Sequence, residues 1–213
     1  MIIIHNLSAA ASLMPRASKE QADHNRTAIT EASARLFREH GVDNVSIAEL
    51  MAAAGLTHGG FYGHFESKEV LAGEACRWAF GRSVERWKKR IADKADRSVA
   101  RAVLTDNYLS SQSRSGPDGS CPATSLACDV ARKSPASPIR TTYVAGLEEL
   151  LKVLASVQDT GAPPSDREAA LADFATMVGG LMLAKATQGE PISDEILSAA
   201  RRRLNRTDRR RQR

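Results

Sequence analysis

A short His-Gly-Gly segment, residues 58–60, joins one hydrogen-bond donor to two residues without side chains. The His58 imidazole can donate to a guanine acceptor or to a phosphate oxygen. Gly59 and Gly60 have no side chain with which to read a base, but they allow the backbone to come close to a partner. Two glycines also cost a helix about 1 kcal/mol each, so we expect a helix here to become firm only when a partner is bound.

The surrounding chain, residues 46–69, has the pattern of two helices joined by a tight turn. Ser46 can cap a helix with apolar residues at helical spacing, and Gly55 stands where that helix needs a left-handed residue to end. We expect Leu56 to be buried in the turn and Thr57 to cap a second, shorter helix. The second helix of such a helix-turn-helix can enter a major groove, although an ordinary helical hairpin gives the same pattern.

The residues that follow make the pattern more specific. Phe-Tyr-Gly-His-Phe at residues 61–65 and Ser-Lys-Glu at residues 67–69 resemble the DNA-binding signature of the TetR family of bacterial transcriptional regulators. Residues 28–41, AITEASARLFREHG, resemble the family's first helix. The resemblance covers about the first third of the chain. It implies an all-α protein in which a three-helix DNA-binding domain is joined to a helical domain for ligand binding and dimerisation.

The resemblance also implies roles for single residues. The family's recognition helix would lie at residues 57–62, with the Thr57 and Tyr62 hydroxyls on phosphates, and Lys68 would anchor a phosphate at a helix N-terminus. Arg26 and Ser46 are weaker phosphate candidates, and His64 and Phe65 are expected to pack. For each residue the alternative is capping or solvation. The candidate DNA-binding set is Arg26, Ser46, Thr57, His58, Gly59, Gly60, Tyr62 and Lys68.

Charge is concentrated at the C-terminus. The 213-residue chain has a formal charge of +5, but residues 201–213 contain eight Arg and one Asp, a net of +7, which leaves about −2 for the rest. Any DNA footprint must therefore come from a few placed cations and helix N-termini. The Arg-rich end is expected to be a disordered, solvated tail, with a salt-sensitive contact to DNA or RNA as the alternative.

Composition narrows the class of protein further. Hydrophobic residues make up 42% of the chain, enough for a core, and we expect that no apolar run approaches the length of a membrane span. Three cysteines without a secretory signal indicate a reducing cytoplasm. Signatures of a metal site, a nucleotide loop or a catalytic triad are missing, so we expect no metal, no cofactor and no enzyme activity.

Turn-forming residues, such as Gly and Pro, predict where the domains and helices begin and end. We expect residues 1–22 to be a disordered or mis-assigned extension, 23–69 the DNA-binding domain, 70–204 the effector-binding and dimerisation domain, and 205–213 the Arg-rich tail. Within the larger domain the helices expected are 68–91, 98–109, 121–133, 139–157, 167–187 and 191–204, with a loop at 111–120.

Cys121 stands directly before Pro122, at the expected N-terminus of the helix 121–133. A helix dipole there would lower the pKa of the thiol and favour the reactive thiolate. Cys128 is seven residues further on, about 10.5 Å along a helix, which is too far for a disulfide. The surrounding pattern resembles a sub-branch of the family in which some members sense electrophiles. The alternative is that both cysteines are small apolar fillers.

The most apolar expected helix, 167–187, carries a stripe too apolar to face water: Leu171, Phe174, Val178, Leu181 and Met182. We expect this stripe to be the dimer interface. The family resemblance implies a homodimer on a palindromic operator, a pocket for a small-molecule effector, and most often repression, with no membrane partner. Two alternatives stay open. One is a helical enzyme or ligand carrier with an incidental helix-turn-helix, and the other is a DNA-binding protein without a ligand.

Overall fold

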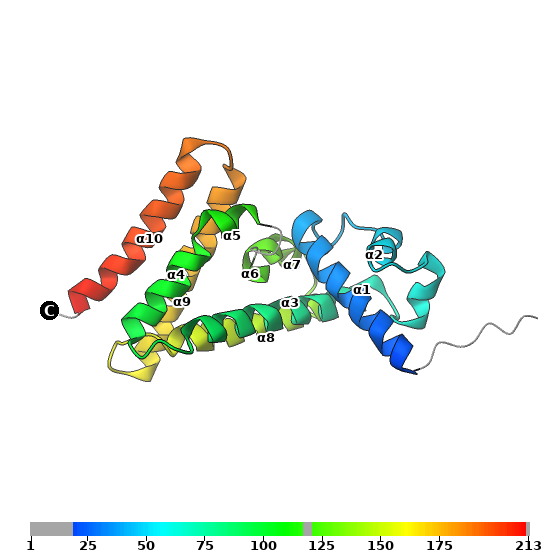
Figure 1. Ribbon diagram of the computed structural model, residues 1–213, viewed down its shortest axis with the longest axis horizontal. Coiled ribbons are helices and arrows are strands. Elements are labelled where there is room, and N and C mark those ends of the chain that lie inside the picture. The colour runs from blue at the N-terminus through cyan, green and yellow to red at the C-terminus, as the bar shows by residue number, and fades with distance from the viewer. Residues whose placement is uncertain (1–18, 117–120, 212–213) are drawn as a thin grey trace, which may run out of the picture.

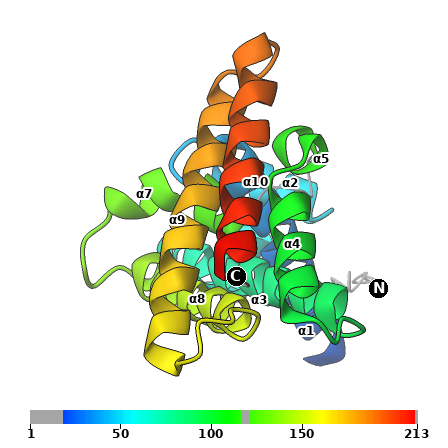
Figure 2. The ribbon, with the colours of Figure 1, turned by 90° about the vertical axis from the view of Figure 1, so that its left-hand side faces the viewer.

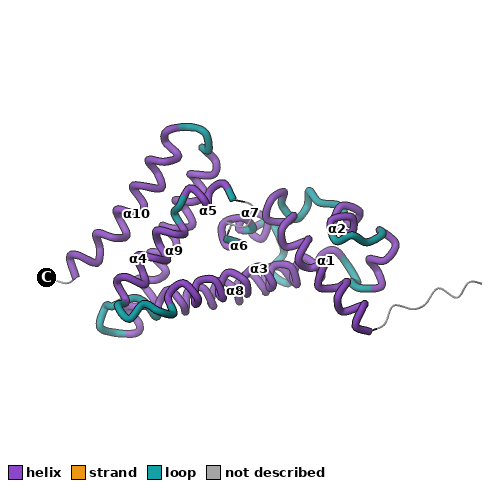
Figure 3. Tube along the Cα trace, in the orientation of Figure 1, coloured by secondary structure: helices purple, strands orange, loops and turns teal. Residues whose placement is uncertain are grey.

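The computed structural model describes residues 19–116 and 121–211, which form helices joined by turns and contain no strand (Figure 1, Figure 3). The all-α expectation is therefore confirmed for the described part of the chain. The N-terminal helices lie at one end of an elongated molecule, and the C-terminal helices lie at the other (Figure 1).

Three elements form the N-terminal unit: α1 (Lys19–His40), α2 (Ile47–Ala53) and the 3-10 helix η1 (His58–Gly63). The core that joins them to α3 (Lys68–Ile91) contains Ile29, Phe37, Leu50, Met51, Phe61 and Phe65. α1 begins at Lys19, so the extension expected to be disordered through residue 22 is wrong over its last four residues. The expectation for residues 1–18 lies outside the described residues.

The second element of the helix-turn-helix differs from the expectation. Gly55 adopts φ +73°, as a helix end requires, and Leu56 is half-buried against the core. However, η1 is a 3-10 helix, in which Gly60 N–H donates to the Thr57 carbonyl at 3.1 Å, and the Thr57 side chain makes no capping bond. Glycine lowers helix propensity, and six residues are too few to offset that cost with α-helical bonds.

α3 connects the two parts of the molecule, because it begins beside the N-terminal unit and runs into the larger domain (Figure 1). α8 (Pro138–Ala155) lies along it and makes the most extensive helix pair of the fold. Gly73 and Gly146 allow this close approach: a β-carbon at Gly73 would lie 3.0 Å from Pro138, and one at Gly146 only 2.2 Å from the Phe80 ring. The α3–α8 pair therefore depends on glycine at both contacts.

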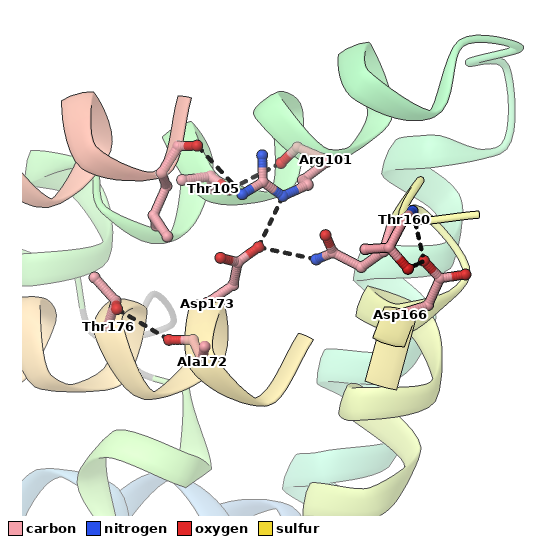
Figure 4. A network of polar contacts seen from close by, with 9 residues as sticks. Arg101, Thr105, Thr160, Asp166, Ala172, Asp173 and Thr176 are labelled. Atoms are coloured by element: carbon pink, nitrogen blue, oxygen red, sulfur yellow. Dashed lines mark hydrogen bonds and ion pairs between the residues drawn. The ribbon is translucent and has the colours of Figure 1, made fainter. Parts of the chain in front are cut away.

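The far end of the molecule consists of α4 (Arg97–Tyr108), α9 (Pro163–Ala186) and α10 (Pro191–Arg211). Figure 2 shows α9 and α10 side by side, with α4 next to α10. A buried polar network ties them together (Figure 4). Arg101 donates to the Asp173 carboxylate at 2.7 Å and to the Leu204 carbonyl at 3.2 Å, and Gln158 donates to Asp173 at 2.9 Å. Asp173 neutralises the Arg101 charge, which is otherwise costly to bury.

Three segments of the larger domain differ from the sequence prediction. Residues 111–115 of the expected loop form α5 (Ser111–Ser115), because the Ser110 hydroxyl caps it by accepting from Ser113 N–H. Residues 117–120 of that loop lie outside the described part. The expected helix 121–133 is two short helices, α6 (Pro122–Ser125) and α7 (Ala127–Ala131), which meet at Leu126.

The C-terminal tail also departs from the expectation. α10 continues to Arg211, so residues 205–211 are helical and the predicted disorder is wrong there; residues 212–213 lie outside the described chain. Arginine is a good helix former, which lets α10 extend past Leu204, the last of its core residues. The end of α10 lies opposite the helix-turn-helix unit (Figure 1), so this tail does not lie beside that unit in the same chain.

α9 is long and apolar enough, by length and composition alone, to cross a bilayer, contrary to the expectation that no segment would be. In the fold it is a core helix: Ala170, Met177 and Ala184 are buried against the protein, and Asp173 binds Arg101. Its other face is also largely apolar.

Candidate nucleic-acid interface and effector cavity

The exposed side of η1 gathers five of the eight candidate DNA-binding residues. Thr57, His58, Gly59, Gly60 and Tyr62 are all exposed, and Tyr62 is 69% exposed. Phe61, between them, is fully buried and fixes the segment, with its ring centroid 5.2 Å from Tyr62 and 5.9 Å from Phe65. Buried Phe61 thus holds η1 so that short polar side chains and the exposed backbone of two glycines lie on one surface.

Lys68 is the first residue of α3, directly after its cap. The Ser67 hydroxyl accepts from Val70 N–H at 3.2 Å, so the capped helix N-terminus and the Lys68 charge lie together, as the sequence predicted. The neighbouring carboxylate, Asp43, has a lowered pKa because it accepts a hydrogen bond from Lys133, and the charges of Lys133 and Lys68 lower it further. The N-terminus of α3 and the Lys68 ammonium are both suited to a phosphate, although the Asp43 carboxylate offsets part of this positive charge.

Ser46 forms the predicted cap of α2. Its hydroxyl accepts from Glu49 N–H at 3.2 Å, and the Glu49 carboxylate accepts from Ser46 N–H at 2.7 Å, which completes a capping box. These bonds lower the pKa of Glu49. The Ser46 hydroxyl also donates to Glu49 at 2.7 Å, so the geometry favours capping over the predicted phosphate contact.

Arg26 has a different place from the one predicted. Its guanidinium donates to the His64 carbonyl and pairs with the Glu74 carboxylate, and it lies over the Phe65 ring at 4.2 Å from the centroid. These contacts clamp α1 onto η1 and α3, so we replace its weak assignment to phosphate with a structural one. His64 and Phe65 pack, as expected. The partners of Arg26 are 38 and 48 residues further along the chain, so no local sequence pattern indicated these contacts.

A cavity of about 300 Å³ lies between α3, α4, α5 and the start of α6. Trp87 and Tyr108 give it aromatic walls, and Arg86, Arg90 and Asn107 give it polar ones. Its size and mixed lining suit a small organic molecule. The family resemblance implied a pocket among the middle helices but did not point to these residues. Described residues hold no group of three His, Cys, Asp or Glu side chains that could bind a metal.

Cys121 lines this cavity but does not have the predicted reactivity. It is only 6% exposed, and burial raises the pKa of its thiol, although Tyr108 works in the opposite direction. The expected helix dipole is weak because α6 has four residues and Cys121 makes no side-chain cap. Cys128 is exposed instead. The hypothesis of an activated Cys121 thiolate is therefore wrong.

The predicted dimer stripe is divided between the inside and the outside of the protomer. Phe174 is 4% exposed and Leu181 is fully buried, so these two belong to the core and not to an interface. Leu171 is exposed, and Val178 and Met182 are partly exposed. Leu183, which broadens the apolar stripe in the sequence but was not assigned to the interface, is 58% exposed on the same outer face. Asp173 lies on the inner face of α9, where it binds buried Arg101, and this partner 72 residues away could not be predicted from the sequence.

Comparison with known proteins supports the assignment of the N-terminal unit. Residues 29–75 match the sequence model of bacterial regulatory proteins of the tetR family. The regulator AcrR of Shigella flexneri is 39% identical over 61 residues, which are 29% of this chain and 28% of AcrR. The repressor KstR2 of Rhodococcus jostii is 30% identical over 84 residues, which are 39% and 41% of the two chains. These alignments thus span less than half of either relative.

The fold comparison extends over the larger domain as well. A TetR transcriptional regulator from Chloroflexus aurantiacus is 25% identical, with a TM-score of 0.73 over 87% of this chain and 94% of the other. NemR of Escherichia coli in its reduced form has the same fold, with a TM-score of 0.72 at 18% identity over 84% and 94% of the chains. The N-terminal sequence therefore matches the tetR family over residues 29–75, and the described chain has the fold of a TetR transcriptional regulator.

Proposed function

We propose that the protein is a cytoplasmic transcriptional regulator that binds a palindromic operator as a homodimer and is released by a small-molecule effector, so that it acts as a repressor. The observation that carries the proposal is the exposed surface of η1, where polar groups and bare backbone are held by buried Phe61 beside the N-terminus of α3. A short element of this shape fits a major groove, with phosphates at its edges.

The cavity among α3, α4, α5 and α6 supports the effector part of the proposal. α3 both lines this cavity and begins beside the DNA-facing surface, so a ligand there contacts the element that carries the DNA-binding unit. A ligand that prefers the DNA-free arrangement must weaken DNA binding by the factor by which DNA weakens ligand binding. The chemistry is a coupling of two binding equilibria rather than catalysis.

The outer face of α9 supports the dimer. Leu171, Val178, Met182 and Leu183 form an apolar stripe on a helix that is otherwise built into the core. Gly179 lies between them with open space around it, which lets a second backbone approach closely. A symmetric dimer through α9 places two η1 surfaces on one DNA, which matches a palindromic site.

Fluorescence anisotropy with DNA from upstream of the gene tests this function. We expect saturable binding that survives an excess of random competitor DNA. Binding that random DNA removes completely would contradict a sequence-specific regulator and leave a ligand-binding protein with an incidental helix-turn-helix.

Tyr62→Phe and Lys68→Ala are each expected to weaken binding to operator and to random DNA by similar factors, because both side chains are assigned to phosphates. Lys68→Ala should also reduce the slope of log affinity against log salt by about one. Anisotropy titrations at several salt concentrations measure both effects. Lys89→Ala, an exposed lysine near the other end of α3, is the control and should change neither. A loss confined to operator DNA would refute the phosphate assignments.

His58→Ala is expected to act differently, because His58 is the exposed donor on η1 best suited to a base edge. It should reduce the preference for the operator over single-base variants of it by about 1–3 kcal/mol, with little change in binding to random DNA. Competition titrations against a panel of substituted operators measure the preference. Equal losses on specific and random DNA would show that His58 reads no base.

A further inference from the structure

A buried hydrogen bond joins the DNA-binding unit to the larger domain at a point away from α3. The Asp129 carboxylate, on α7, accepts from the backbone N–H of Val42 at 3.0 Å, across 87 positions of the chain. Val42 lies in the loop between α1 and α2, and both residues are buried. The second carboxylate oxygen accepts from Arg132 at 2.5 Å, which holds Asp129 in place.

The loop is shaped to receive this carboxylate. Gly41, directly before Val42, adopts φ +84°, a conformation that favours glycine. A β-carbon at Gly41 would also lie 3.1 Å from the Asp129 carboxylate oxygen, so any side chain there crowds the bond. A second, exposed pair crosses the same joint: Lys133 binds Asp43 at 2.5 Å, with the Asp43 side chain 60% exposed. The joint thus has one buried bond and one exposed ion pair.

On its other side, α7 connects to the wall of the cavity. Val130 N–H donates to the Leu126 carbonyl at 2.9 Å, which continues α6 into α7. The Thr124 hydroxyl of α6 bonds to the Tyr108 hydroxyl at 2.7 Å, and Tyr108 lines the cavity. A displacement of Tyr108 by a ligand would therefore move α6 directly. Only Leu126 separates α6 from α7, and Asp129 of α7 binds Val42.

We propose that Asp129 is a positioning residue that fixes the angle of the DNA-binding unit against the larger domain and passes movements of α6 to it. α3 provides the covalent attachment, and α1 packs on its first turns with Arg26 paired to Glu74, so this first attachment runs through α3 alone. The bond from Asp129 to Val42 is a second attachment on a different element, and two attachments define an orientation. Its consequence for operator DNA rests on the proposed function, whereas the mechanical role does not.

The mechanical role can be tested without DNA. Spin labels on Ala52→Cys of α2 and Val144→Cys of α8, both exposed sites, report the distance between the two units in a Cys128→Ser background. Labelled chain is diluted with unlabelled chain so that each distance lies within one molecule. We expect a narrow distribution with Asp129, a clearly broader one in Asp129→Ala, and an intermediate one in Asp129→Asn, which keeps an acceptor oxygen.

Two further variants separate positioning from general loosening. Lys133→Ala removes the exposed pair and leaves the buried bond, so it should keep the narrow distribution. Gly41→Ala places a β-carbon against the Asp129 carboxylate and should broaden the distance distribution. Thermal unfolding identifies any variant that is not folded at the measuring temperature, and Asp129→Asn then replaces Asp129→Ala. A distribution equally narrow in Asp129→Ala, or in Asp129→Asn where it takes that place, overturns the inference.

The DNA consequence is tested with operators whose half-sites are moved apart by one or two base pairs. The wild type should discriminate strongly against these, and Asp129→Ala should lose about tenfold of that discrimination, about what one hydrogen bond to a charged group contributes. If distances broaden while discrimination is unchanged, Asp129 does not act on DNA binding and that part of the inference fails. If the wild type binds no operator at all, the proposed function fails, and the distance measurement still decides the role of Asp129.

Discussion

Leu183→Glu is expected to convert the protein from a dimer to a monomer and to weaken operator binding by about a hundredfold or more. Leu183 is 58% exposed on the outer face of α9, within the stripe of Leu171, Val178 and Met182. In a dimer through this face, the glutamate charge would be buried without a partner on each side of the symmetry axis. Such a charge costs roughly 3–5 kcal/mol, which exceeds what one hundredfold change in affinity represents.

Sedimentation velocity measures the assembly, and anisotropy titration measures the operator affinity of the same samples. Val144→Glu is the matched control, because Val144 is 53% exposed on α8, outside the α9 face, and undergoes the same exchange. It should remain dimeric and bind the operator normally. Circular dichroism confirms that both variants are folded. A folded Leu183→Glu protein that sediments as a dimer would place the interface on another surface.

The sequence predicts that α9 is apolar but does not predict which of its residues, such as Leu183, face outward. The apolar stripe over residues 171–182 predicted a helix correctly. The prediction that Phe174 and Leu181 lie in the dimer interface was wrong. Both are buried inside the protomer, so Leu181→Glu would unfold the chain rather than separate two chains. Periodicity shows that a helix has apolar faces; it does not show which face meets the protein's own core, because the neighbouring helices decide that.

The DNA-binding unit was more predictable because its signals are local. The Ser46 cap, Gly55 at a helix end, and the start of a helix at Lys68 each depend on residues within three or four positions, and the structure confirms all three. Features that depend on distant partners were missed. Arg26 was assigned to phosphate because the carbonyl of His64 and the carboxylate of Glu74 are not visible from its neighbours.

The predictions for Cys121 and for the C-terminal tail were wrong for the same kind of reason. A Cys-Pro pair does predict the start of a helix, and α6 does begin at Pro122. Whether the thiol is reactive depends on its burial by other elements of the fold, and that burial raises the pKa where the helix dipole was expected to lower it. In the tail, charge predicted disorder, whereas helix propensity and the support of Leu204 in the core extended α10.

Gly146→Ala is expected to lower the free energy of unfolding by about 3 kcal/mol, the upper end of the usual cost of overpacking a core. The added β-carbon would lie 2.2 Å from Phe80 Cγ and 2.6 Å from Phe80 Cβ. Phe80 cannot swing away as the tip of a long side chain could, because its ring is buried and packs edge-on against Tyr143 at 5.3 Å between centroids. The clash must instead separate α3 from α8.

Gly81→Ala provides a control of opposite sign on α3. Gly81 is exposed, and a β-carbon there meets nothing within 4 Å, so the exchange should raise the free energy of unfolding by up to about 1 kcal/mol. Urea unfolding followed by circular dichroism, at one protein concentration, measures both variants. Adding Phe80→Leu to Gly146→Ala should cost less than the two single changes together, because each relieves the other. Equal stabilities of Gly146→Ala and Gly81→Ala would contradict the close packing of α3 on α8.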